Sequence, residues 1–222
     1  MTTFVLIPGA GGVAWYWSYV APLLEVAGHD VIAVDLPGDD ENAGLPEYAD
    51  LVVKAIGERD DVELVAQSLG GFTAPMVCTR APVTGLVFVN AMIPTPGETP
   101  DAWGDNTRSA DARIAAAKAG DYPTDFDEFT YFLHDVAPEV VAEGERYQRP
   151  ETDAVFATRC EFDAWPDVPT RVLVAADDRL FPADFQRRVA RERLGIEPDV
   201  LPGGHLIALA HPDLVAEYLL GS

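Results

Sequence analysis

Short apolar runs alternate with helical patterns along the first 90 residues and again after residue 170. Continuous runs of Val, Ile, Leu and Phe of this length are typical of strands buried on both faces, and such strands form parallel sheets. The expected strands are Phe4–Ile7, Val31–Val34, Val62–Ala66, Val83–Val89, Arg171–Ala175 and Pro198–Leu201. Strand–helix–strand order with right-handed crossovers predicts an α/β fold: a mostly parallel six-stranded sheet with helices on both faces.

The alternation stops between residues 91 and 169, where no strand-like run occurs between turn signals. Prolines open this segment, aromatic residues are frequent in it, and three stretches have helical patterns. The expected helices here are Asp111–Ala119, Asp125–Leu133 and Glu151–Thr158. At about 150 residues per domain, a chain of 222 residues is one domain with an insertion. We therefore expect residues 1–90 and 170–222 to form the core, and residues 91–169 to form a helical cap over the strand ends.

Acidic side chains dominate the charge: Asp and Glu number 37 against 15 Lys and Arg, a net charge of −22. This field repels nucleic acids and anionic membranes, because both are bound largely through basic side chains. No apolar run approaches the roughly 18 residues of a membrane helix, and the first residues are not typical of a signal peptide. The two cysteines, Cys78 and Cys160, are too few for a disulfide scaffold, so a reducing cytoplasm is the expected location.

Histidine and cysteine usage also bears on metals. The four histidines include no His-x-x-x-His pair, and two cysteines cannot build a cysteine metal site. We therefore expect no metal and no cofactor.

Ser68 follows the expected strand Val62–Ala66 and precedes a helical pattern that begins at Leu69. Small residues, Ala66 and Gly70, lie two positions before and two after it. A strand, a sharp turn and a helix with small flanking residues are the context of a nucleophile elbow, where larger side chains clash with the adjoining strand or helix. The usual pattern is Gly-x-Ser-x-Gly, and the methyl group of Ala66 is a mild departure. The alternative is a serine that only caps the helix.

A glycine-rich segment, Pro8–Gly12, follows the first expected strand. Glycine lets the backbone approach a ligand closely and present its N–H groups. Together with the serine turn, this segment predicts an oxyanion hole formed by the N–H groups of Leu69 and Ala10. A tight turn is one alternative, and a dinucleotide-binding loop with Asp35 after the second strand is another. The dinucleotide pattern is incomplete, because Ala14 stands where its last glycine belongs.

Two acidic residues, Asp177 and Asp178, follow the fifth expected strand, and His205 lies on a glycine-rich loop after the sixth. Open α/β sheets bind ligands beyond the carboxyl ends of their strands, so these side chains should meet Ser68 at one edge. A histidine there can take a proton from the serine while an acid orients its ring. Either aspartate could be that acid, or both could be turn residues. His211 is the alternative base, although His211-Pro212 is more typical of a helix start.

The order Ser68, acid, His205 is that of α/β-hydrolases and differs from that of the two familiar serine protease folds. The chain resembles the α/β-hydrolase superfamily over almost its whole length, and the esterase-like branch of plant methylesterases and hydroxynitrile lyases is the most similar. The resemblance is carried by Phe4–Gly11, Ala14-Trp15, Asp35–Gly38, Gln67–Gly71, Asp178 and Gly204-His205. It implies Asp178 as the acid, because Asp178 begins the Asp-x-x-x-Pro sequence that fits the family.

The chain departs from the family pattern at two places. Pro8-Gly9 stands where relatives usually have His-Gly, which alters the loop but keeps the backbone donor. Asp39-Asp40-Glu41 follows Gly38, where relatives usually have His-Gly, and this bears on substrate contacts.

The resemblance also narrows the chemistry. Haloalkane dehalogenases and epoxide hydrolases use an aspartate nucleophile, whereas this chain has Ser68. Hydroxynitrile lyases are expected to carry a lysine near the catalytic histidine, and neither Lys54 nor Lys118 is near His205. Cofactor-free haloperoxidases and C–C bond hydrolases reuse the same triad, so both stay open.

The sequence therefore predicts a serine hydrolase that cleaves a small carboxylic ester or related acyl compound through an acyl-enzyme. Ser68 is the expected nucleophile, His205 the general base and acid, and Asp178 the residue that orients the imidazole. A small-molecule substrate is the expected partner. An α/β-hydrolase-fold receptor or interaction protein with little turnover is the alternative, because fold does not fix function.

Two features of residues 91–169 bear on the substrate. The aromatic side chains either line an apolar pocket or pack the core of the cap. Three arginines either meet a substrate carboxylate or form a solvated face: Arg146, Arg149 and Arg159.

Overall fold

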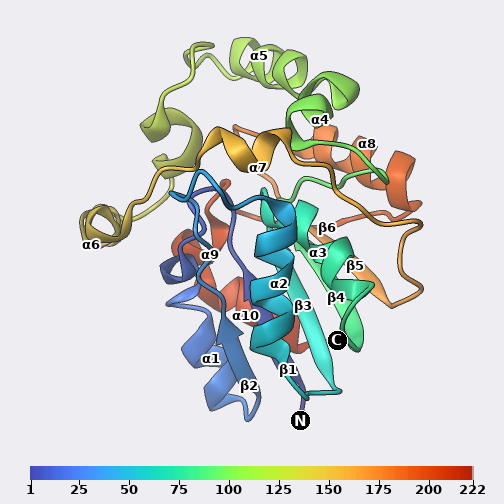
Figure 1. Ribbon diagram of the computed structural model, residues 1–222. Helices are drawn as coiled ribbons and strands as arrows, with labels where there is room; N and C mark the ends of the chain where they lie inside the picture. Colours follow the sequence, from blue (N-terminus) through green and yellow to red (C-terminus); the bar gives the residue numbers. More distant parts are fainter. Residues whose placement is uncertain (222) are drawn as a thin grey trace.

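A computed structural model describes residues 1–221, which contain a six-stranded parallel sheet in the order β2-β1-β3-β4-β5-β6 (Figure 1). The strands are β1 (Thr3–Ile7), β2 (Asp30–Ala33), β3 (Val62–Gln67), β4 (Val83–Val89), β5 (Thr170–Ala175) and β6 (Asp199–Leu201). All neighbouring strands pair in parallel. The predicted α/β fold with six strands is confirmed, and the sheet is parallel throughout.

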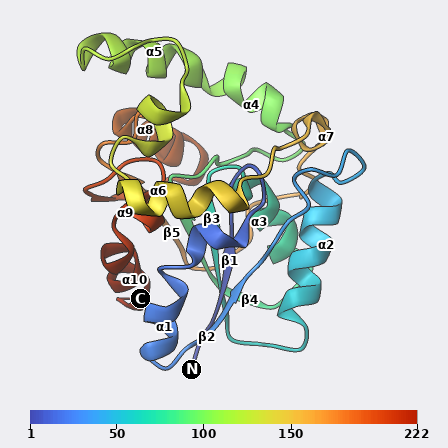
Figure 2. The ribbon, with the colours of Figure 1, turned by 90° about the vertical axis from the view of Figure 1, so that its left-hand side faces the viewer.

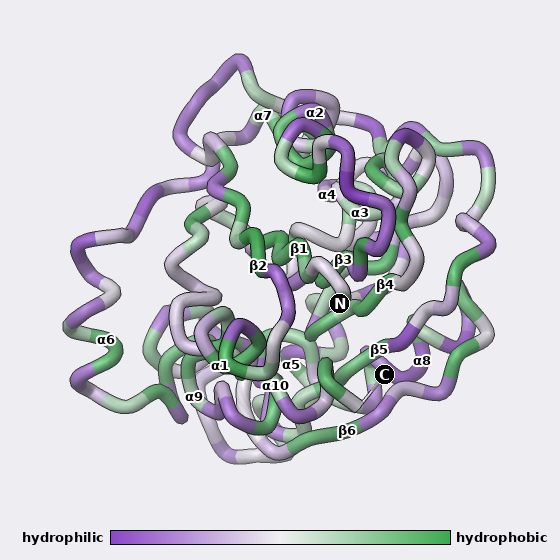
Figure 3. The backbone as a smooth tube through the Cα atoms, turned by 90° about the horizontal axis from the view of Figure 1, so that it is seen from below, coloured by the Kyte–Doolittle hydropathy of each residue, from purple (hydrophilic) through white to green (hydrophobic). Residues whose placement is uncertain are grey.

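Alternate side chains of each strand enter two separate cores. In β1, Val5 and Ile7 face one core, while Phe4 and Leu6 face the other. The helices that cover the first face are α2 (Leu45–Ile56), α3 (Gly70–Cys78) and α8 (Ala183–Leu194). The opposite face is covered by η1 (Ala14–Trp17), α1 (Ala21–Val26), α9 (Ile207–Ala210) and α10 (Pro212–Leu220). Apolar residues on both faces explain the continuous hydrophobic runs, and Figure 3 shows the central strands largely in the hydrophobic colour.

The segment between β4 and β5 is helical, and we call residues 91–169 the helical insertion. Its elements are α4 (Pro100–Thr107), α5 (Ser109–Ala119), the π-helical turn η2 (Phe129–Leu133), α6 (Pro138–Gly144), η3 (Glu145–Tyr147) and α7 (Asp153–Ala157). They lie over the carboxyl ends of the strands, at the opposite end of the sheet from the N-terminus (Figures 1 and 2). The division into core and cap domains at residues 90 and 170 stays a prediction.

The helices differ from the sequence patterns at three places. The apolar residues of Val13–Val26 have the spacing of a single helix, but the structure divides this stretch into η1 and α1, because i→i+3 hydrogen bonds persist to Val20 before the α-helix starts. A 3₁₀ turn has nearly the same side-chain spacing, so the apolar periodicity survives the break. Helices α4 and α6 were not expected. Both start with a proline, Pro100 and Pro138, and the first position of a helix tolerates proline because its N–H needs no partner there.

Among residues 1–221, the structure has no helix of the length and apolar character needed to cross a membrane.

The central strands should carry much of the stability. Phe88 in β4 is fully buried and meets Trp165 edge to face at 5.8 Å. We expect Phe88→Ala to lower the free energy of unfolding by about 3–5 kcal/mol, because it removes contacts and leaves a cavity. Val26→Ala, at a side chain that is 89% exposed, should change it by less than about 0.5 kcal/mol. Urea unfolding followed by circular dichroism measures both, and equal effects would contradict the two-faced core.

Candidate active site

Ser68 occupies the sharp turn between β3 and α3, where its backbone is in the left-handed region with φ +49°. This conformation is strained for a non-glycine residue. It is held by backbone hydrogen bonds, since the Ser68 carbonyl accepts from Met92 N at 2.9 Å and from Gly71 N at 3.1 Å. The neighbouring glycines leave no room for a side chain. A Cβ on Gly70 would lie 2.6 Å from the Pro8 carbonyl oxygen, and one on Gly71 would overlap the Met92 carbonyl oxygen.

The structure brings Ser68, His205 and Asp178 together. His205 Nε2 lies 3.0 Å from Ser68 Oγ, and its Nδ1 lies 2.8 Å from Asp178 Oδ2. All three residues are buried, and Asp178 and His205 are only 4% and 1% exposed. A carboxylate only accepts hydrogen bonds, so Nδ1–H donates to it and the Nε2 lone pair faces the serine hydroxyl.

The Asp178 carboxylate is held by hydrogen bonds from residues that follow it closely in the chain. Its Oδ1 accepts from Leu180 N and Phe181 N, both at 2.9 Å, and its Oδ2 accepts from Gln186 Nε2 at 3.1 Å. Asp177 points elsewhere: it is exposed, and its Oδ2 accepts from Gly203 N at 3.2 Å. Asp178 therefore lies beside the imidazole, and Asp177 supports the loop that carries the histidine.

The histidine loop is fixed from two further sides. Asn90, which follows β4 with φ +46°, donates through Nδ2 to the carbonyls of Gly204 and His205, both at 3.1 Å. Asp135, in the helical insertion, accepts from Gly204 N at 2.5 Å. Neither residue was singled out from the sequence. Asn90 had a sequence signal that could have found it, because it directly follows the buried strand β4, and Asp178 likewise comes shortly after β5.

Gln67 adds a second polar contact to His205. Its Nε2 lies 3.3 Å from His205 Nε2 and 3.5 Å from the His205 carbonyl oxygen. The side-chain amide therefore donates toward the same nitrogen that faces Ser68, and it limits how the ring can turn.

Two backbone amides, those of Ala10 and Leu69, lie at the same edge of the sheet as Ser68. Within residues 1–221, the N–H groups of Ala10 and Leu69 donate no hydrogen bond to another residue. Ala10 is exposed in the loop after β1, and Leu69 precedes the first turn of α3. Unpaired N–H groups beside a serine hydroxyl can donate hydrogen bonds to a negatively charged oxygen.

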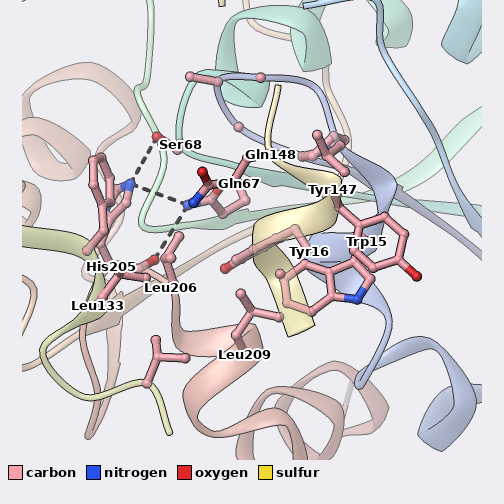
Figure 4. A pocket seen from close by; sticks show the side chains of 18 of the residues that line it. Trp15, Tyr16, Gln67, Ser68, Leu133, Tyr147, Gln148, His205, Leu206 and Leu209 are labelled. Atoms are coloured by element: carbon pink, nitrogen blue, oxygen red, sulfur yellow. Dashed lines mark hydrogen bonds between the residues drawn. The ribbon is translucent and has the colours of Figure 1, made fainter. Parts of the chain in front are cut away.

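A cavity of about 320 Å³ opens in front of Ser68 and His205 (Figure 4). Its walls are mostly apolar, from the core on one side and the helical insertion on the other. The apolar lining includes Val13, Trp15, Tyr16, Phe132, Leu133, Val136, Val140, Val141, Tyr147, Leu206 and Leu209. The aromatic side chains of the insertion therefore serve both roles foreseen for them: Phe132 and Tyr147 line this cavity, whereas Trp103 and Tyr131 are buried packing residues.

Arg149, from the helical insertion, is bound to the loop after β1. Its Nε donates to the Gly11 carbonyl at 2.8 Å, and its Nη2 donates to the carbonyls of Gly12 at 3.1 Å and Leu36 at 2.6 Å. Asp35 Oδ2 lies 3.2 Å from both terminal nitrogens. The guanidinium is thus engaged with the core and with Asp35, so the solvated face expected for Arg149 was wrong. Its contact with a substrate carboxylate stays a prediction, which these existing partners disfavour.

Glu151 binds the same loop through the N–H group of Gly11. Gly11 N donates to Glu151 Oε2 at 2.6 Å, and the Tyr48 hydroxyl donates to Glu151 Oε1. Burial raises the pKa of the Glu151 carboxyl, opposed by the hydrogen bonds from Tyr48 and Gly11. Both polar groups of the Gly11 backbone are therefore bound by the insertion. The two contact partners are about 140 positions apart in the chain, so no local sequence pattern indicates this contact.

Asp35 and His211, the residues of the two alternative assignments, have other partners in the structure. Asp35 accepts from Ala14 N at 3.0 Å and pairs with Arg149, and the strand order differs from that of dinucleotide-binding folds. His211 Nε2 lies 4.0 Å from Asp135 Oδ2, and its residue precedes α10 as expected for a helix start.

The sheet order, the serine turn after β3 and the His–Asp pair from the loops after β6 and β5 together define the class of α/β hydrolases. The family model described as "Alpha/beta hydrolase family" matches residues 4–218, so the chain belongs to this family.

Several known proteins are similar over most of their length. The pyrethroid hydrolase of Sphingobium wenxiniae is 26% identical over 243 residues, covering 98% of this chain and 86% of that protein. Methylesterase 3 of Arabidopsis thaliana is 28% identical over 212 residues, covering 82% and 81%. The crystal structure of polyneuridine aldehyde esterase superposes with a TM-score of 0.80 at 22% identity, covering 100% of this chain and 98% of that one. The expected likeness to the esterase-like branch is confirmed.

The serine turn depends on the two glycines behind it. We expect Gly71→Ala to destabilise the fold by more than about 2 kcal/mol and to impair the site, because the methyl group meets the rigid Met92 carbonyl. Gly85→Ala in β4 is a suitable control, since its Cβ would be 3.4 Å from Glu63 Cγ, an ordinary contact. Thermal unfolding of both variants measures the difference, and a Gly71→Ala protein as stable as the control would contradict it.

Proposed function

We propose that this chain is a serine esterase that hydrolyses a small, neutral carboxylic ester through an acyl-enzyme. The observation that carries the proposal is the continuous hydrogen-bond chain from Ser68 through His205 to Asp178 at the floor of an apolar cavity. The esterase names of the relatives support the same chemistry.

The geometry assigns a role to each atom of this chain. Ser68 Oγ attacks the ester carbonyl while His205 Nε2 takes its proton. Asp178 holds the Nδ1–H tautomer and stabilises the imidazolium that forms. The tetrahedral intermediate then expels the alcohol, which receives the proton from His205 Nε2. Water attacks the acyl-enzyme by the reverse sequence, with His205 again the base, and releases the acid.

The oxyanion of both tetrahedral intermediates is assigned to the N–H groups of Ala10 and Leu69. Such donors stabilise charge that develops only in the transition state, and loss of one typically costs roughly 3 kcal/mol. Leu69 is fixed by the serine turn, whereas Ala10 lies in a glycine-rich loop with positive φ at Gly11 and Gly12.

The charges around the cavity favour an uncharged substrate. Glu128 and Glu151 lie in its lining, and the chain carries a net charge of −22. The Arg149 donors are occupied by backbone carbonyls and Asp35, so they are not available to a substrate carboxylate. A neutral ester with an apolar acyl or alcohol group matches the lining.

Arg149 and Glu151 are assigned as positioning residues for the Ala10 donor. They bind the carbonyl and the N–H of Gly11, the residue next to Ala10, and so restrict a loop that glycine would otherwise leave mobile. In this proposal the helical insertion is a cap whose docking completes the oxyanion hole.

The first test is the nucleophile. We expect the wild-type protein to react with a fluorophosphonate probe and to hydrolyse p-nitrophenyl acetate, and Ser68→Ala to do neither. Mass spectrometry should find the phosphonyl group on Ser68. A wild-type protein that neither labels nor turns over any short-chain ester would contradict the proposal. Specific ligand binding without turnover, retained in Ser68→Ala, would instead indicate the receptor function that the fold also permits.

The second test is the loop. We expect Arg149→Gln to lower kcat by roughly 10-fold or more with KM changed less than about threefold, because a displaced donor affects the transition state. Arg146→Gln is the matched control, since Arg146 is exposed and pairs with Glu143 in the same stretch. Glu151→Gln keeps the acceptor for Gly11 N and should retain most activity, unlike Glu151→Ala. Equal kcat in all of these variants, at matched thermal stability, would rule out the positioning role.

A further inference from the structure

The Tyr16 side chain forms part of the cavity wall and carries a hydroxyl that the proposed reaction does not use. Tyr16 belongs to η1 and is only 7% exposed. Its oxygen accepts a hydrogen bond from Ala208 N at 3.4 Å, in the first turn of α9, where a helical N–H lacks a backbone partner. Among the described residues 1–221, the Tyr16 hydroxyl donates no hydrogen bond to another residue.

The Tyr16 hydroxyl is a hydrogen-bond donor in a largely apolar cavity wall, and it has an unused proton to donate. Buried tyrosine hydroxyls normally find a hydrogen-bond partner, and leaving one unsatisfied is costly. Figure 4 shows the hydroxyl pointing to the side of the pocket that holds Leu206 and His205, whereas Trp15 and Tyr147 lie on the other side. The surrounding lining, with Leu206 and Leu209, is apolar.

The surroundings of Tyr16 also favour the neutral, protonated form of its phenol. Burial raises the pKa of its phenol well above the ordinary value, a shift that the hydrogen bond from Ala208 opposes and the charges of Asp178 and Asp135 increase. The hydroxyl therefore stays neutral and keeps its proton to donate. No hydrogen bond joins it to Ser68, His205 or Asp178, so its role is separate from proton transfer.

We propose that the Tyr16 hydroxyl binds a second oxygen of the substrate, in the acyl or alcohol group that fills the cavity. The substrate class is then a neutral ester that also carries a ketone, aldehyde or ether oxygen, and the plain hydrocarbon ester is the poorer substrate. This inference rests on the proposed ester hydrolysis at Ser68. It makes Tyr16 a specificity-determining residue, because a site built to hydrogen-bond a substrate group discriminates against analogues that lack it.

The test compares esters that differ by one oxygen. One series is p-nitrophenyl hexanoate with its 4-oxo and 5-oxo analogues, and the other is n-butyl benzoate with 2-methoxyethyl benzoate. Each kcat/KM value is divided by the rate of alkaline hydrolysis of the same ester. We expect this ratio, for the wild-type protein, to be higher for at least one oxygen-bearing ester than for its hydrocarbon partner. Tyr16→Phe should lower kcat/KM for that ester roughly 5- to 20-fold and change the hydrocarbon ester less than about twofold.

The controls separate this inference from the function on which it rests. Tyr19→Phe loses a hydroxyl that donates to Glu143 at 2.7 Å outside the cavity lining, and it should leave the preference intact. Hydrolysis by wild type without any preference overturns the inference alone, and so does an equal loss on both esters in Tyr16→Phe. If Tyr16→Phe does not fold, the wild-type preference still decides. A wild-type protein that hydrolyses none of the esters overturns the proposed function as well.

Discussion

The common direction of the six strands is the constraint on which the site depends. Because every strand is hydrogen-bonded in parallel to its neighbour, all of the carboxyl ends lie at one edge of the sheet. The residues that follow β1, β3, β5 and β6 therefore meet there, and they include Ala10, Ser68, Asp178 and His205. Ser68 and His205 are 137 positions apart in the chain, yet their side chains are in hydrogen-bond contact. Local turn geometry refines this arrangement, but the parallel ladder creates it.

Much of this could be predicted from the sequence because the relevant signals are local. Strands buried on both faces leave continuous apolar runs, and these runs located all six strands to within a few residues. The position of Ser68 also followed from local requirements, since a sharp turn between strand and helix needs small neighbours such as Gly70. A histidine on a glycine-rich loop after the last strand could be placed at the same edge by topology alone. Once the strands are known to be parallel, short sequence patterns are enough to predict the contact between Ser68 and His205.

The remainder depends on contacts that leave no local pattern. Asp177 and Asp178 are adjacent, and only the conformation of the loop decides that the second one faces the imidazole; the family resemblance, not the residue pattern, favoured it. The binding of Arg149 to Gly11 joins residues 138 positions apart, and an arginine in a polar connecting stretch is usually solvated. The helical insertion was recognised as a segment, but two of its helices were missed because an opening proline indicates a turn as readily as a helix start.

The attachment of Arg149 and Glu151 to the loop after β1 has a consequence for evolution and for engineering. Suppose that the helical insertion is exchanged between two related proteins. The transferred insertion then carries its own residues at positions 149 and 151, while the recipient keeps its own loop after β1. The two segments are therefore structurally coupled despite their separation in the sequence. A chimera that moves the lid alone loses the anchors of the loop, and one that moves both segments keeps them.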